Sequence, residues 1–185
     1  MLKYLSTFIP ANEKVGVYED NQEIHYRKIN PGKKCAEFFV DEKFHIHRLS
    51  ERDCGIILTG HFVGVRGPEV LDLLNSLSTG ASCMTTIHLD DVRGLPDRMY
   101  NMLGSCDITE RFINNIYKYI DVGVLVECDA KERRRITQMA FYDNEGGRNT
   151  CTVLYDREGK TPQQIPEDYQ RRFLRYGIEN PYQTA

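Results

Sequence analysis

Apolar residues in the first third of the chain form short runs that predict strands separated by polar turns. Met1–Ile9 has the apolar periodicity of a helix, which must stop at Pro10 because proline lacks the N–H needed to continue it. We expect strands at Lys14–Tyr18, at Ala36–Val40 and over the interrupted run from Ile56 to Val63.

The middle of the chain carries firmer helix signals. Pro68 suits the first turn of a helix because its missing N–H costs nothing there, and apolar side chains then recur on one face. Gly80 supplies the C-terminal cap of this helix. Further helices are predicted over Asp97–Leu103 and after Asp107, which is followed three residues later by Glu110 and so forms a capping box.

The last part of the chain changes from helical periodicity to short runs that predict three strands: Val122–Glu127, Ile136–Tyr142 and Asn149–Tyr155. The segment Asp143–Gly147 has the chemistry of a hairpin turn. The tail from Pro162 spaces Tyr169, Phe173 and Tyr176 as in a short helix that packs on the body or on a neighbour. The whole pattern predicts an α/β body in which parallel units give way to an antiparallel meander.

Length and composition allow one globular body and exclude several classes of protein. The 185 residues are 41% apolar and carry a net charge of −3, so nothing draws the chain as a whole toward nucleic acid. The short run Arg133-Arg134-Arg135 is best interpreted as a solvated loop. The six cysteines are scattered, and no signal peptide or membrane-spanning run is present, which favours a cytoplasmic protein with reduced thiols.

The order of motifs around the Pro68 helix is the most informative feature of the sequence. Arg66-Gly67 opens this helix, Thr79-Gly80 ends it, and the next strand finishes in Thr85-Thr86-Ile87-His88. This order resembles the secretion ATPase superfamily, which includes the ATPases of type II and type IV secretion and of pilus and Flp/Tad assembly. The resemblance implies a truncated RecA-like motor domain over residues 1–160 and a helical tail over residues 161–185.

The resemblance also implies the functional residues. Such ATPases use a carboxylate at one strand end to orient or deprotonate the attacking water, and a histidine at another to contact the γ-phosphate. These catalytic roles are carried over to Glu19 and His88. Taken alone, however, the acidic run after Tyr18 could simply cap a strand, and His88 could be structural. The implied nucleotide-binding residues are Asp20, Glu23, Arg66, Gly67, Thr85 and Thr86.

Two nucleotide-binding elements of such ATPases are missing from the sequence. No G-x-x-x-x-G-K-[ST] loop is present, and Met1–Leu5 resembles the helix that follows this loop. The run Phe62–Gly67 has no acid where the superfamily places the carboxylate that holds Mg²⁺, and Glu69 is the nearest one. In the superfamily, Thr85–His88 corresponds to the second half of a motif called the His box, and the first histidine of that motif is missing from Ala81–Cys83. The segment 41–54, which links the second and third predicted strands, is too short for the helix expected there.

The resemblance implies ATP and Mg²⁺ as cofactors, a hexameric ring, and a place in secretion or pilus machinery at the inner membrane. Because the missing parts position the phosphates and the metal, we expect little or no ATPase activity from the chain alone. Two alternatives remain open: a non-catalytic module that keeps the ring-forming surface, or the remnant of a truncated gene.

A zinc site is a further alternative. His45, His47, Cys54 and His61 offer the nitrogen and sulfur atoms that bind Zn²⁺. Their spacing fits no common zinc module, and a divergent loop accounts for the same residues. The sequence therefore favours a divergent loop over a zinc site for these residues.

Overall fold

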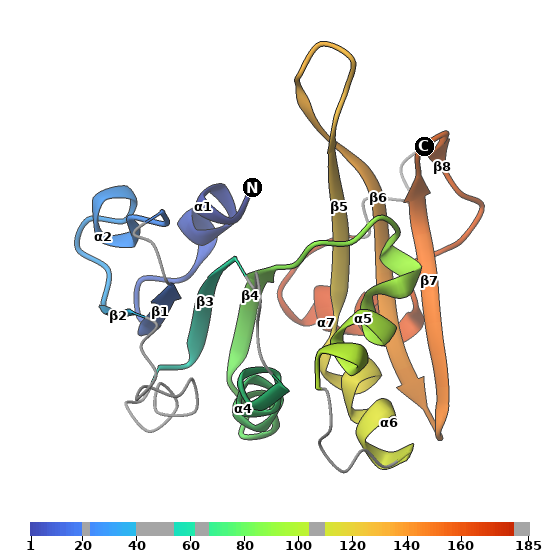
Figure 1. Cartoon of the computed structure of the whole chain (residues 1–185), viewed down its shortest axis with the longest axis horizontal. Helices are drawn as coiled ribbons and strands as arrows, with labels where there is room; N and C mark the ends of the chain where they lie inside the picture. Colours follow the sequence, from blue (N-terminus) through green and yellow to red (C-terminus); the bar gives the residue numbers. More distant parts are fainter. Residues whose placement is uncertain (20–22, 40–53, 62–66, 104–109, 180–185) are drawn as a thin grey trace. The chain divides into compact units, whose positions relative to one another are not determined.

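The computed structural model describes residues 1–19, 23–39, 54–61, 67–103 and 110–179 (Figure 1). The chain divides into two compact units. The first comprises Met1–His88 with Met102–Cys106, and the second comprises Leu89–Asn101 with Asp107–Ala185. The predicted boundary at residue 160 remains a prediction, and the C-terminal helix belongs to the second unit.

The first unit is built on a parallel sheet in the order β2-β1-β3-β4. These strands are β1 (Val15–Glu19), β2 (Cys35–Phe39), β3 (Ile56–His61) and β4 (Ser82–Thr86). All residues of the central strand β1 are buried, as expected for a parallel strand covered on both faces. The predicted parallel α/β units are therefore confirmed.

Helices cover both faces of this sheet (Figure 1). On one face, Ile9 and Tyr26 pack with β1 and β3, next to the helices α1 (Leu2–Leu5), η1 (Ser6–Phe8) and α2 (Tyr26–Ile29). On the other face, Leu73 of α4 (Gly67–Ser78) packs against Tyr18 and Ile57. Helix α4 confirms the helix predicted from Pro68, and Gly80 follows it at φ +97°, which glycine adopts without strain.

The second unit is built on an antiparallel sheet in the order β5-β6-β7-β8. Its strands are β5 (Val122–Cys128), β6 (Arg134–Glu145), β7 (Arg148–Asp156) and β8 (Gly159–Lys160). Gly146 and Gly147 both have positive φ and make the turn between β6 and β7. The predicted meander and its hairpin are confirmed.

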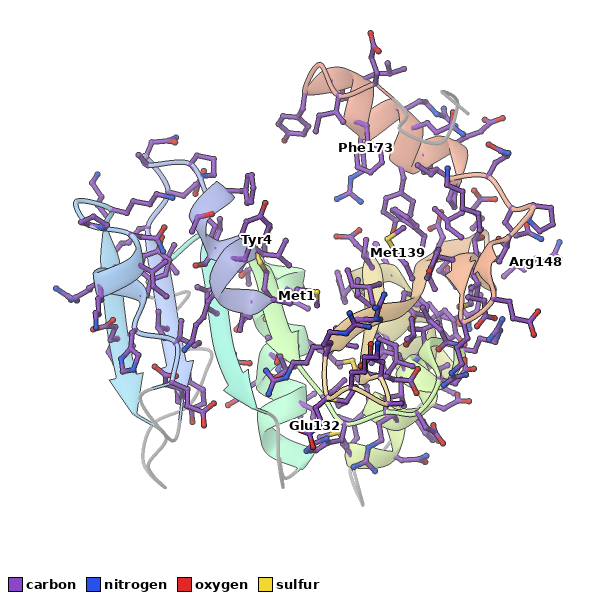
Figure 2. All side chains as sticks on the ribbon, turned by 90° about the horizontal axis from the view of Figure 1, so that it is seen from above. Met1, Tyr4, Glu132, Met139, Arg148 and Phe173 are labelled. Carbon is purple, nitrogen blue, oxygen red and sulfur yellow. The ribbon has the colours of Figure 1, made fainter. Side chains whose placement is uncertain are left out.

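Helices lie on both faces of this second sheet. The helix α7 (Glu167–Arg175) packs Tyr169 and Phe173 on Phe141, and the Tyr169 and Phe141 rings meet edge to face with centroids 4.6 Å apart. In Figure 2, Phe173 projects from α7 toward the part of the sheet that carries Met139. Tyr176, which was predicted to pack with them, is 83% exposed. The other face is covered by η2 (Val92–Gly94), α5 (Leu95–Met102) and α6 (Glu110–Tyr119).

A buried amide joins η2 to the second sheet. Gln138 of β6 is fully buried, and its Oε1 accepts a hydrogen bond from the Val92 N–H at 3.0 Å. Its Nε2 donates to Asp91 at 3.0 Å and to Asp156 at 2.9 Å. The exposed Arg93 guanidinium forms ion pairs with both carboxylates, at 3.0 Å to Asp91 Oδ2 and 2.6 Å to Asp156 Oδ2. The Gln138 side chain therefore finds a partner for its carbonyl and for both of its amide hydrogens.

Candidate functional site

The carboxyl ends of three neighbouring strands meet at one edge of the first sheet. Tyr18 of β1 is in register with Thr59 of β3, so Glu19 lies one residue further along this edge. His61 of β3 is in register with Thr86 of β4. Ligands of open α/β sheets bind at this edge. The topology therefore gathers the strand-end residues that the sequence singled out.

The Glu19 carboxylate is held by backbone groups a few residues beyond its own strand. The residue is 7% exposed, and its Oε2 accepts hydrogen bonds from the backbone N–H groups of Glu23 and Ile24, each at 2.9 Å. A carboxylate is suited to this place because two amide donors compensate its loss of water. Glu19 therefore has a structural role, independent of any catalytic role.

Two threonine hydroxyls join β3 and β4 on the other side of the sheet. The Oγ1 atoms of Thr59 and Thr85 lie 2.6 Å apart and share a hydrogen bond. Side chains alternate along a strand, so these hydroxyls lie on the α4 face with Ile57 and Cys83, whereas Glu19 lies on the face of Val15 and Val17. Thr59 was not predicted as a functional residue; its place at the end of an apolar strand was the available signal.

The other predicted site residues lie at or near the ends of β1 and β4 and at the start of α4, or outside the described residues. His88 lies two residues beyond β4 and is exposed, Thr86 is half-buried, and Glu23 is exposed. Gly67 is the first residue of α4. Asp20 and Arg66 lie outside the described residues. Thr85 and His88 are exposed, and hydroxyl and imidazole groups can donate hydrogen bonds to an anion.

Cys83 is the cysteine of β4. Burial raises the pKa of its thiol to about 12. The thiolate, which is the nucleophilic form of cysteine, is therefore scarce at neutral pH. The low fraction of thiolate argues against Cys83 as an attacking group.

A Gly-Lys-Thr triplet occurs elsewhere in the chain but does not form a phosphate-binding loop. Gly159 and Lys160 make the short strand β8, which pairs antiparallel with β7. The Thr161 hydroxyl donates to the backbone carbonyl of Val153. A phosphate-binding loop instead connects a strand to the N-terminus of a helix. Gly159–Thr161 therefore does not take the place of the phosphate-binding loop that is missing from the sequence.

Carboxylates come together in the second unit as well. One oxygen each of Asp143, Glu145 and Asp168 lie within 4.8 Å of one another, but Asp168 also pairs with Arg171 at 2.9 Å. These are surface side chains of the hairpin and of α7. Of the zinc ligands considered from the sequence, His45 and His47 lie outside the described residues, and Cys54 is buried.

Two solved structures of bacterial ATPases have the same fold as this chain. The VirB11 ATPase of the Brucella suis type IV secretion system, determined in complex with sulphate, matches 76% of this chain with a TM-score of 0.63 and 21% identity. The Legionella pneumophila ATPase DotB matches 79% with a TM-score of 0.55 and 20% identity. The predicted RecA-like α/β fold is therefore confirmed, and the chain shares it with these two ATPases.

The match covers only part of each of those proteins. The chain spans 43% of the VirB11 structure and 42% of the DotB structure. No protein-family model and no curated protein sequence matches the chain. Each helix in the described part of the chain is too short or too polar to cross a membrane.

Proposed function

We propose that the chain is the C-terminal portion of a secretion ATPase motor domain, and that it has little or no ATPase activity alone. The observations that support this proposal are the fold shared with the VirB11 and DotB ATPases and the positions of Glu19 and Thr86 at the carboxyl ends of β1 and β4. In this proposal the chain belongs to a ring at the cytoplasmic side of the inner membrane, and the ring serves a secretion or pilus apparatus.

The described residues fit one part of a nucleotide better than the rest. The Thr85 hydroxyl and the exposed His88 imidazole suit the oxygens of a terminal phosphate, because both groups can donate hydrogen bonds to it. Among the described residues, the one group of three potential metal ligands lies in the second unit and not at this edge. The sequence contains no phosphate-binding loop. We therefore assign contact with phosphate, and not hydrolysis, to this chain.

Calorimetric titration of the folded chain with ATP, with and without Mg²⁺, tests the proposal. We expect weak saturable heat that decreases when His88→Asn removes the imidazole. His25→Asn is the matched control, because His25 is also exposed and its φ of 51° is tolerated by asparagine. Equal loss in both variants, or no heat from a chain shown to be folded, would contradict the assigned contact.

Phosphate release measured on the same preparation tests the absence of turnover. Loss of the loop and its lysine removes most of the positioning on which phosphoryl transfer depends. Mg²⁺-dependent release clearly above that of a Glu19→Gln variant would show that the chain is an active ATPase, and the proposal would then fail in its second part.

A non-catalytic interaction module is the second candidate function. It is favoured by apolar side chains on the surface of the first unit, where Tyr4 and Phe8 are each 67% exposed and stack edge to face at 5.1 Å. Such surface commonly marks a protein contact. Co-purification with a full-length secretion ATPase that is lost in Tyr4→Ser/Phe8→Ser would favour this function, and an unchanged yield would exclude this surface.

A further inference from the structure

The hydroxyl groups of Thr59 and Thr85 form a hydrogen-bonded pair whose members differ in their access to solvent. Their Oγ1 atoms lie 2.6 Å apart. Thr59 is 3% exposed, and Tyr18 of the neighbouring strand β1 lies beside it on the α4 face of the sheet. Thr85 is exposed. A ligand in solution can therefore contact the Thr85 hydroxyl directly, whereas Thr59 is placed to act through Thr85.

The pairing of β3 with β4 is irregular at this point. Leu58 lies opposite Met84, and the register has shifted by one residue in the pair that follows. Two residues of β3, Thr59 and Gly60, therefore lie opposite Thr85 alone. Such bulges are frequent next to active sites, where they redirect a side chain. The hydroxyl pair thus lies where the two strands depart from regular pairing, at their carboxyl ends.

The direction of the hydrogen bond between the two hydroxyls decides what Thr85 can do. A hydroxyl group has one proton to donate and two lone pairs that accept. If Thr85 donates to Thr59, its proton is used and it meets a ligand as an acceptor. If Thr59 donates to Thr85, the Thr85 proton can point toward the ligand. Phosphate oxygens accept hydrogen bonds, so the second arrangement is the one that suits a phosphate.

We propose that Thr59 is a positioning residue for the nucleotide: it donates its hydroxyl proton to Thr85 and so directs the Thr85 hydroxyl toward a phosphate oxygen. The inference rests on the proposed function, in which Thr85 contacts phosphate. In a chain of hydrogen bonds from Thr59 through Thr85 to the anion, each bond polarises the next, which strengthens both. Because Thr59 is already held in the buried face of the sheet, orienting Thr85 through it costs little conformational entropy on binding.

Calorimetric titration of Thr59 variants with ATP tests the inference. Thr59→Val keeps the branched shape but removes the hydroxyl, so the dissociation constant for ATP should rise about fivefold, the effect of one neutral hydrogen bond. Thr59→Ala also lacks the hydroxyl and should weaken binding in the same way, whereas Thr59→Ser keeps it and should restore affinity. Thr79→Val is the matched control, since it removes a hydroxyl that donates to a backbone carbonyl at 2.7 Å just before the start of β4.

A double-mutant cycle separates positioning from a general structural effect. Thr85→Val removes the group through which Thr59 acts, so adding Thr59→Val to it should weaken ATP binding no further. A structural effect alone would lower the affinity equally with and without the Thr85 hydroxyl. Circular dichroism and urea unfolding establish that each variant in the cycle is folded.

The outcomes distinguish this inference from the proposed function. ATP binding that His88→Asn weakens but Thr59→Val leaves unchanged would overturn the role of Thr59 and leave the phosphate contact standing. Equal losses in Thr59→Ser and Thr59→Val, or additive losses in the double-mutant cycle, would also overturn that role alone. No saturable heat from a folded wild-type chain would overturn the phosphate contact and this inference together.

Discussion

Glu19 shows how one side chain can belong both to a predicted catalytic motif and to the architecture around it. Its carboxylate accepts from the N–H groups of Glu23 and Ile24 and lies at the end of a fully buried strand. Removing it leaves two amide donors without their acceptor. A loss of activity after mutation of Glu19 therefore needs a measurement of stability beside it.

We predict that Glu19→Ala lowers the free energy of unfolding by about 2–3 kcal/mol, because two donors near the core lose a charged acceptor. Glu19→Gln keeps an oxygen that can accept and should cost less. Urea unfolding of both variants measures the difference. The matched control is Glu23→Ala, which truncates an exposed side chain and should change stability by less than about 0.5 kcal/mol. Similar losses at both positions would contradict the structural role of Glu19.

At the scale of elements, two buried tyrosines differ in the hydrogen bonding of their hydroxyl groups. Tyr142 of β6 donates its hydroxyl to the carbonyl of Val92 at 2.5 Å and so holds η2 against the sheet. An added Cβ at Gly123 would strike this hydroxyl, which explains the glycine in β5. Tyr26 of α2 is equally buried, but within the described part of the chain its hydroxyl has no hydrogen-bond partner.

The same substitution should therefore have different effects at these two tyrosines. Tyr142→Phe leaves the Val92 carbonyl without its donor and should lower the free energy of unfolding by about 1–2 kcal/mol. Tyr26→Phe removes a buried polar group that is not compensated, so stability should stay the same or rise. Thermal and urea unfolding of the pair provide the comparison. A clear loss in Tyr26→Phe would show that its hydroxyl has a partner.

Across the whole molecule, local signals predicted most of the elements, and long-range contacts decided the rest. The α4 helix and the β6–β7 hairpin followed from apolar periodicity, Pro68 and the glycines of the turn. Helix α2 was not predicted, because it is a single turn whose burial depends on Tyr26 packing against the sheet. The Thr59–Thr85 bond was not predicted either, since it joins residues 26 apart through strand pairing.

The second unit should lose stability in acid. Hydrogen bonds from Arg93 and Gln138 lower the pKa of Asp156, and the Arg133 N–H together with Arg135 lowers the pKa of Asp129 to about 2. A carboxyl with a lowered folded-state pKa contributes stability that is complete above its unfolded pKa of about 4 and is lost as the pH falls further. The expected loss therefore begins near pH 4 and continues below it.

Urea midpoints measured between pH 5 and pH 2 test this expectation. Asp156→Asn removes one of the titrating groups, so its midpoint should fall less steeply with acid than that of the wild type. Arg93→Ala removes the strongest cause of the lowered Asp156 pKa and should flatten the same part of the curve. An unchanged slope in both variants would assign the acid sensitivity to other groups.

The fully satisfied amide of Gln138 has a consequence for how this sequence can diverge. A glutamate there would set a third carboxylate between Asp91 and Asp156 and would leave the Val92 N–H as its one remaining donor in this network. A leucine would leave the Val92 N–H without its acceptor and both carboxylates with Arg93 but without the amide donor. Replacing Gln138 alone should therefore destabilise the second unit. Asp91, Gln138 and Asp156 are expected to change together and not singly.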